Sequence, residues 1–194
     1  MRSARSPRAG SRAAATESKD VQFEDLADAA IPLHLVAFDL IEGRELLLSE
    51  GPAGEAIAAS ASIPGIFPPV ATGEHRLIDG GVINNTPISP AVELGAERIY
   101  ILPTQEPHSR PARLPTCALD AAIQGLHLLV GRRVEADVAR YSAEAELIML
   151  PVPNAGCVQP TSFEHSHRLI TDARAAARTA LRRSTRGAHL RLVS

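Results

Sequence analysis

One short segment of the chain combines a carboxylate with residues that let other groups approach the backbone. Asp79 follows the predicted strand at 76–78 and is itself followed by Gly80 and Gly81. Ligands and catalytic groups of open α/β sheets gather at the carboxyl ends of strands, and glycines allow a substrate to come close to the main chain. An isolated Asp-Gly-Gly is also typical of a tight turn with positive φ. The motif alone therefore indicates either a site or a turn.

A proline-rich loop precedes this motif, and two asparagines follow it. Residues 64–70 read PGIFPPV, and the three prolines exclude a regular helix because each lacks a backbone donor and fixes φ. We expect an ordered loop here. We expect Asn84 and Asn85 to hydrogen-bond the loop after Asp79, since short amide side chains commonly stabilise turns in this way.

Other reactive side chains give weaker signals. Ser60 and Ser62 are the serines nearest to the motif, but no glycines flank them to allow the strained turn of a nucleophilic serine. His165 and His167 are two residues apart near a predicted helix start, so they point in different directions and indicate no triad or metal site. Cys117 lies at another predicted helix start, where a thiolate is favoured, although a small residue near a loop is the simpler interpretation. The sequence predicts no metal and no cofactor.

The elements that must position these residues alternate between strands and helices. Such alternation indicates βαβ units and a mostly parallel sheet with helices on both faces. The predicted fold is therefore α/β with three layers. The predicted strands cover 33–38, 45–49, 76–78, 98–102 and 146–150, and the predicted helices cover 55–62, 87–94, 116–141 and 162–181.

Composition narrows the function classes. The chain has 194 residues, of which 45% are hydrophobic and 22% charged, which is typical of a soluble globular domain. Its formal net charge of −2 argues against a nucleic-acid-binding protein, which normally carries a basic excess. No apolar run approaches the roughly 20 residues that a membrane-spanning helix needs. Two cysteines are too few for a disulfide scaffold.

The ends of the chain differ from the region between them. Residues 1–19 are rich in Arg and Ser, with Glu17 as the first acidic residue, and we expect a disordered tail. An organelle transit peptide is the alternative for such a leader. Residues 184–194 are predicted as a basic tail, which leaves 20–183 as the folded part.

The last predicted helix carries a basic stripe. Arg174, Arg178 and Arg182 recur every four residues, opposite an inward face that includes Leu169 and Ile170. A stripe of this kind is typical of a solvated helix face, and contact with a lipid or a partner is the alternative.

Three motifs in order closely resemble the patatin-like phospholipase family. They read A-S-x-x-I-P-G-x-F-P-P from Ala59, L-I-D-G-G-x-x-N-N-x-P from Leu77 and E-L-G-A-x-R-I-Y from Glu93. The resemblance covers residues 22–183. It implies that 20–183 form the carboxyl-terminal part of a patatin-like domain that is incomplete at its amino-terminal side.

The resemblance also implies an activity. Members of the family hydrolyse acyl esters of lipids with a Ser–Asp dyad, and Asp79 corresponds to the base, within a motif that Gly80 and Gly81 complete. The implied substrate is a lipid or another acyl ester, and neither a cofactor nor a nucleic acid takes part. The implied location is cytoplasmic, with peripheral contact at a membrane.

The chain departs from the family pattern at the nucleophile. The family serine lies in G-x-S-x-G upstream of the Asp motif, and no G-x-S-x-G occurs in the 194 residues. The Gly-rich loop that would donate hydrogen bonds to the oxyanion is missing as well. We therefore expect a truncated lipid acyl hydrolase that retains its base and is inactive alone. The alternatives are a non-catalytic lipid- or partner-binding module and half of a split enzyme.

Overall fold

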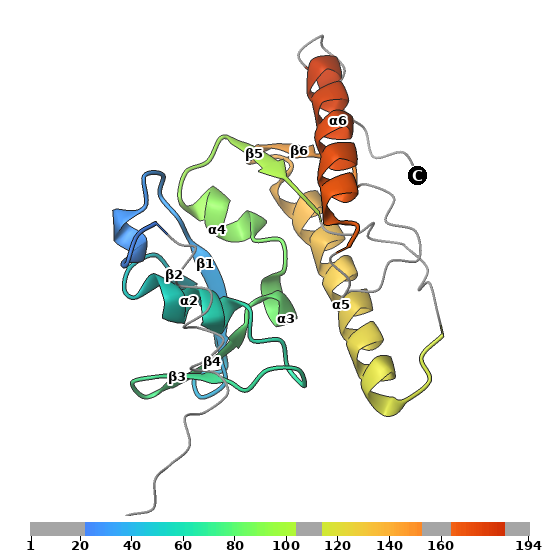
Figure 1. Cartoon of the computed structure of the whole chain (residues 1–194). Helices are drawn as coiled ribbons and strands as arrows, with labels where there is room; N and C mark the ends of the chain where they lie inside the picture. The colour runs from blue at the N-terminus through green and yellow to red at the C-terminus, as the bar shows by residue number, and fades with distance from the viewer. Residues whose placement is uncertain (1–21, 104–113, 153–163, 185–194) are drawn as a thin grey trace, which may run out of the picture. The chain divides into compact units, whose positions relative to one another are not determined.

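The computed structural model describes residues 22–103, 114–152 and 164–184, which belong to two compact units (Figure 1). The first unit ends at Pro87 and the second begins at Ile88. The predicted tail at 1–19 lies outside the described residues, as does 184–194 apart from Ser184. No helix in the described part of the chain combines the length and the apolarity needed to cross a membrane.

A four-stranded sheet forms the centre of the first unit. All its neighbouring strands pair antiparallel, so the prediction of a mostly parallel sheet is wrong for this unit. The connections at 40–43 and 73–74 are too short for a parallel crossover, which needs a dozen or more residues. The strand order is β2-β1-β4-β3, with bounds β1 (Leu35–Asp39), β2 (Arg44–Leu48), β3 (Val70–Thr72) and β4 (His75–Asp79).

The helix α2 (Ala53–Ser60) packs on this sheet and forms its main core. Side chains alternate between the faces of a strand, and Ala37 of β1 is fully buried with Leu77 of β4 and Ala59 of α2. The small alanines let the helix approach the sheet closely. The 3₁₀ helix η1 (Leu26–Asp28) adds a second cluster, in which Leu26 contacts the amino-terminal half of α2.

The second unit contains the βαβ arrangement that the sequence predicts. Strands β5 (Arg98–Ile101) and β6 (Glu146–Met149) are parallel, and the long helix α5 (Ala118–Tyr141) connects them. Its core joins Ile88 of α4 (Ile88–Glu93) to Ile101 and Tyr141. The α/β class is thus confirmed, whereas a parallel pairing is found here and not in the first unit.

The last helix, α6 (Ser166–Ser184), also belongs to the second unit. Its predicted start near residue 162 lies outside the described residues. The prediction that Ile170 faces inward is wrong, because this side chain is 65% exposed. Leu169 and Leu181, on the same predicted face, are partly buried.

Candidate active site

Asp79 is the last residue of β4, and its side chain is partly exposed. The two preceding residues, Leu77 and Ile78, are buried and anchor the strand. Asp79 pairs across the sheet with Ala37 of β1, which is itself fully buried. A firmly packed strand therefore carries the carboxylate to the rim of the sheet, where it remains accessible.

The main chain holds one oxygen of this carboxylate. Oδ1 of Asp79 accepts a 2.7 Å hydrogen bond from the backbone N–H of Gly81. Within residues 22–103, 114–152 and 164–184, no hydrogen-bond partner contacts the other oxygen, Oδ2. A carboxylate with one oxygen fixed and the other accessible is arranged to accept a proton from a hydroxyl placed beside it.

Positions 80 and 81 are glycines because the packing around them is close, and not because their backbone needs a positive φ. Gly80 has φ −65° and neither glycine has positive φ, so the interpretation of the motif as a tight turn with positive φ is wrong. A Cβ on Gly80 would collide with the backbone carbonyl of Val36 in β1. A Cβ on Gly81 would lie 3.0 Å from Oδ1 of Asp79 and 2.8 Å from Oδ1 of Asn85. Both positions therefore have little room for a side chain.

The proline loop begins with a type II turn over residues 63–66. Pro64 fixes φ at the second position, and Gly65 has φ +83° at the third, a value that L side chains rarely adopt. The N–H of Ile66 donates to the carbonyl of Ile63 at 3.0 Å and closes the turn. The predicted ordered loop is confirmed in this segment.

This turn exposes apolar side chains next to the strand that carries Asp79. The backbone N–H of Asp79 donates to the carbonyl of Ser62 at 3.0 Å, which ties the start of the loop to the end of β4. Ile66 is 54% exposed and Phe67 is 48% exposed. An accessible carboxylate and an exposed apolar loop thus belong to neighbouring segments.

The nearby serines do not form a dyad with Asp79. Ser62 is buried, and its Oγ donates a 2.6 Å hydrogen bond to the carbonyl of Ala58. Ser60 is the last residue of α2. No hydrogen bond joins either hydroxyl to Asp79 in the described part of the chain.

Asn84 anchors the short helix α3 (Gly81–Asn84), which directly follows the motif. Its side chain is buried, and Nδ2 donates to both carboxylate oxygens of Glu45 in β2, at 3.0 and 3.1 Å. Asn85 is exposed, and its side-chain oxygen lies beside Gly81. The hydrogen bonds of Asn84 therefore hold the segment after Asp79 to β2.

Asp39 is a buried carboxylate to which the motifs assign no chemistry. It is fully buried at the end of β1, and Oδ2 lies 2.6 Å from Nδ1 of His75. Oδ1 accepts from the N–H groups of Ile41 and Arg76 at 3.0 and 3.3 Å. Burial raises the pKa of Asp39, but the hydrogen bonds from His75, Ile41 and Arg76 outweigh it and lower the pKa to about 2.

Asp39 and Asp79 lie at opposite ends of the β1–β4 pair. β1 and β4 run antiparallel, so Asp39 lies opposite Leu77, while Asp79 lies opposite Ala37. Asp39 therefore pins the β1–β4 pair at one end, and Asp79 lies at the other. The signal for Asp39 in the sequence is an acidic residue that ends an apolar strand just before a turn, where side chains often accept backbone hydrogen bonds.

The remaining candidates lie in the second unit. His165 and His167 are exposed at the start of α6, and Cys117 is exposed just before α5. Cys157 lies outside the described residues. Among the side chains that the structure describes, no group of three or more His, Cys, Asp or Glu is arranged to hold a metal ion.

Comparison with known proteins connects the first unit to a family. Residues 13–92 match the family model of patatin-like phospholipases. An NTE-family protein of Mycobacterium bovis is 46% identical over 52 residues, which are 27% of this chain and 9% of that protein. Another NTE-family protein, from Mycobacterium tuberculosis, is 32% identical over 83 residues, which are 43% of this chain and 23% of that protein. The chain thus spans less than a quarter of these relatives.

Proposed function

We propose that Asp79 is the general base of a lipid acyl hydrolase, because residues 13–92 match the family model of patatin-like phospholipases. The observation that carries the proposal is the carboxylate itself. It lies at the rim of the sheet with Oδ1 held by the N–H of Gly81 and with Oδ2 accessible. Asp79 is the base of a Ser–Asp dyad in this proposal, and no metal or cofactor is needed.

The proposed reaction passes through an acyl-enzyme. Asp79 takes the proton of a serine hydroxyl while the serine oxygen attacks the ester carbonyl. The tetrahedral oxyanion collapses, the alcohol leaves with the proton from Asp79, and the acyl group stays on the serine. A water molecule, deprotonated by the same carboxylate, then attacks the acyl carbon. The bond to the serine oxygen breaks, the proton passes from Asp79 to that oxygen, and the fatty acid is released. Gly81 keeps the base oriented throughout, because its N–H holds Oδ1.

The nucleophile of this dyad comes from outside the 194 residues. G-x-S-x-G does not occur in them, and the hydroxyl of Ser62 already donates to Ala58. A preceding segment of a longer chain, or a separate chain, supplies the serine and the oxyanion donors. We therefore expect the 194-residue chain to lack esterase activity by itself.

The exposed turn beside Asp79 favours an acyl substrate. Ile63, Ile66 and Phe67 are each at least one-third exposed, and the loop is bonded to the backbone of Asp79 through Ser62. Apolar groups next to an accessible base suit the hydrocarbon chain of a lipid ester. We also propose that the complete domain has three layers, with helices on both faces of its sheet.

A non-catalytic module is the second candidate. The observation that favours it is that G-x-S-x-G does not occur in the 194 residues, although the carboxylate of Asp79 is held in an accessible position. Such a module would bind a lipid or a protein through the same exposed loop and would have no covalent chemistry.

Complementation separates the two candidates. The purified chain is mixed with, or fused behind, a patatin-family segment that carries G-x-S-x-G, and hydrolysis of 4-nitrophenyl butyrate is measured. We expect hydrolysis only when both parts are present, together with labelling of the added serine by a fluorophosphonate probe. If the assembled protein gains neither activity nor labelling, the dyad proposal is wrong and the non-catalytic module is supported.

A further inference from the structure

The helix α6 separates its charged and apolar residues into two arcs. A helix turns about 100° per residue, which places all its arginines in one half of the circumference, together with Ala175, and its large apolar residues in the other half. Asp172 is the one acidic residue in the helix. The arginines whose side chains are described are all exposed, namely Arg168, Arg174, Arg178 and Arg182.

The apolar arc is partly covered, whereas the basic arc faces solvent. Leu169, Ala173 and Leu181 are partly buried. Ile170 lies at the border of the two arcs, close to the position of Arg174 on the helix, and is 65% exposed. The accessible surface of α6 therefore carries four exposed arginines with one large apolar residue at their edge, together with small and polar residues and Asp172.

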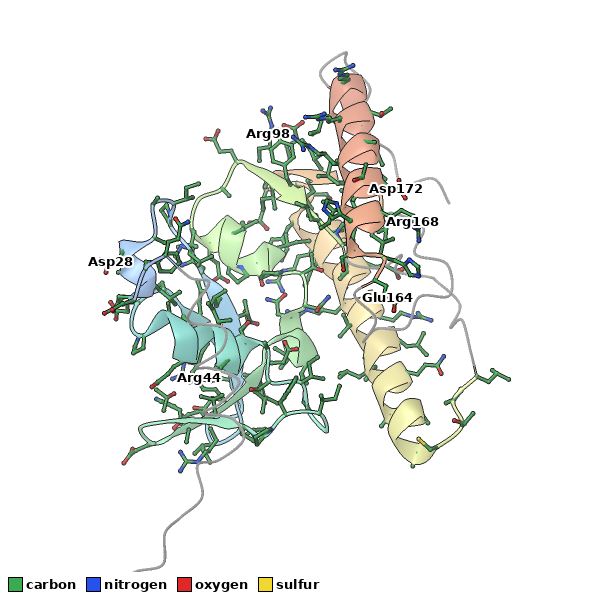
Figure 2. The ribbon with its side chains drawn as sticks, viewed as in Figure 1. Asp28, Arg44, Arg98, Glu164, Arg168 and Asp172 are labelled. Atoms are coloured by element: carbon green, nitrogen blue, oxygen red, sulfur yellow. The ribbon has the colours of Figure 1, made fainter. Side chains whose placement is uncertain are left out.

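Much of this positive charge is not neutralised within the described residues. Arg168 pairs with Asp172 at 3.4 Å, and both side chains project from α6 (Figure 2). No ion pair is described for Arg174 or Arg178 within 22–103, 114–152 and 164–184. The whole chain has a net charge of −2, so the basic arc is a local concentration against an acidic background.

We propose that this basic arc of α6 binds the surface of an anionic lipid bilayer. Arg174 and Arg178 are one helical turn apart, about 6 Å, so both guanidinium groups can bind lipid phosphates, with bidentate geometry. Ile170 enters the interface beside them, as apolar residues of surface-bound amphipathic helices do. The helix contains no Phe, Tyr or Trp for base stacking, which disfavours single-stranded nucleic acid. Because α6 lies outside residues 13–92, the inference does not depend on the proposed hydrolase.

Vesicle cosedimentation of the full chain tests this surface. Vesicles of phosphatidylcholine alone are compared with vesicles that also contain phosphatidylglycerol. We expect binding only to the anionic vesicles and weaker binding at high salt. Since each arginine near an anionic leaflet contributes about fivefold to partitioning, Arg174→Glu with Arg178→Glu should lower partitioning at least about 20-fold.

Two control variants isolate the position of the charge. Arg174→Lys with Arg178→Lys keeps the charge and should retain binding within roughly threefold. Arg44→Glu reverses an exposed arginine of β2 and should bind as the wild type does. Equal binding to neutral vesicles, unchanged binding of the double Glu variant, a loss as large in Arg44→Glu, or preferential binding of a short single-stranded RNA would overturn the proposal.

Discussion

At the scale of single residues, the site depends on close contacts that leave no room for larger side chains. Gly80 packs against the backbone of β1, and Gly81 lies against the carboxylate of Asp79. The sequence singles out both glycines, but a motif alone does not distinguish a positive φ from a close approach. The position of the neighbouring strand β1 decides between the two, and the motif does not predict that β1 pairs with β4.

Gly80→Ala should destabilise the first unit. The new Cβ would overlap the carbonyl of Val36, and a backbone group cannot rotate away as a flexible side chain can. We expect a loss of about 3 kcal/mol in the free energy of unfolding, at the upper end of overpacking effects. Urea denaturation followed by circular dichroism measures it.

A matched glycine in α5 provides the control for this substitution. A Cβ on Gly125 would meet no atom within 4 Å, so Gly125→Ala should leave stability unchanged or raise it by up to about 1 kcal/mol. Equal effects of the two substitutions would contradict the packing argument for Gly80.

Asp39 should make the stability of the protein fall in acid. Its pKa is lowered from 3.8 to about 2 in the folded state, so its contribution is complete above pH 3.8 and is lost as the pH falls toward 2. We expect the urea midpoint of the wild type to decrease through this range more steeply than that of Asp39→Asn. Parallel pH profiles for the two proteins would show that the buried carboxylate does not stabilise the fold.

At the scale of secondary structure, the positions of the elements follow from the sequence better than their pairing does. The strand predicted at 33–38 is β1 at Leu35–Asp39, and the helix predicted at 87–94 contains α4 at Ile88–Glu93. Apolar runs and prolines mark these boundaries locally. The direction of β4 relative to β1 depends on contacts between segments far apart in the sequence. A pattern of alternating strands and helices is compatible with parallel and with antiparallel pairing of two such strands.

The turn at 63–66 gives a prediction at this scale. Gly65 has φ +83°, so Gly65→Ala places a Cβ in a conformation that costs an L residue about 1 kcal/mol. We expect the free energy of unfolding to fall by about that amount, while Ile66→Ala, which truncates an exposed side chain, should change it much less. Urea denaturation of both variants tests this, and a larger loss for Ile66→Ala would mean that the turn is held by packing instead.

At the scale of the whole molecule, the family relationship and the division into units nearly coincide. The family match ends at residue 92, and the first unit ends at Pro87. Asp79, the proline loop and their supports all belong to this unit. The motif together with the family resemblance indicated Asp79 as the candidate base, whereas the sequence did not predict the contact of the buried Asp39 with His75 or the hydrogen bond from Ser62 to Ala58.

The chain alone should be catalytically silent, because the proposed dyad needs a serine that the 194 residues do not contain in a G-x-S-x-G context. Incubation with a fluorophosphonate probe, followed by mass spectrometry of the intact chain, measures this directly. We expect no adduct. A stoichiometric adduct on Ser60 or Ser62 would contradict the assignment of the nucleophile to another segment.

The most direct measurement compares Asp79→Asn with Asp28→Asn after the chain has been combined with a segment that carries G-x-S-x-G. Asp28 is an exposed acidic residue of the same unit (Figure 2) and controls for the loss of one negative charge. The account predicts that Asp79→Asn lowers the rate of 4-nitrophenyl butyrate hydrolysis at least about 1,000-fold, in line with the loss of other catalytic dyad and triad members, and that Asp28→Asn leaves it unchanged. Hydrolysis by Asp79→Asn at the rate of the unsubstituted protein would contradict the account.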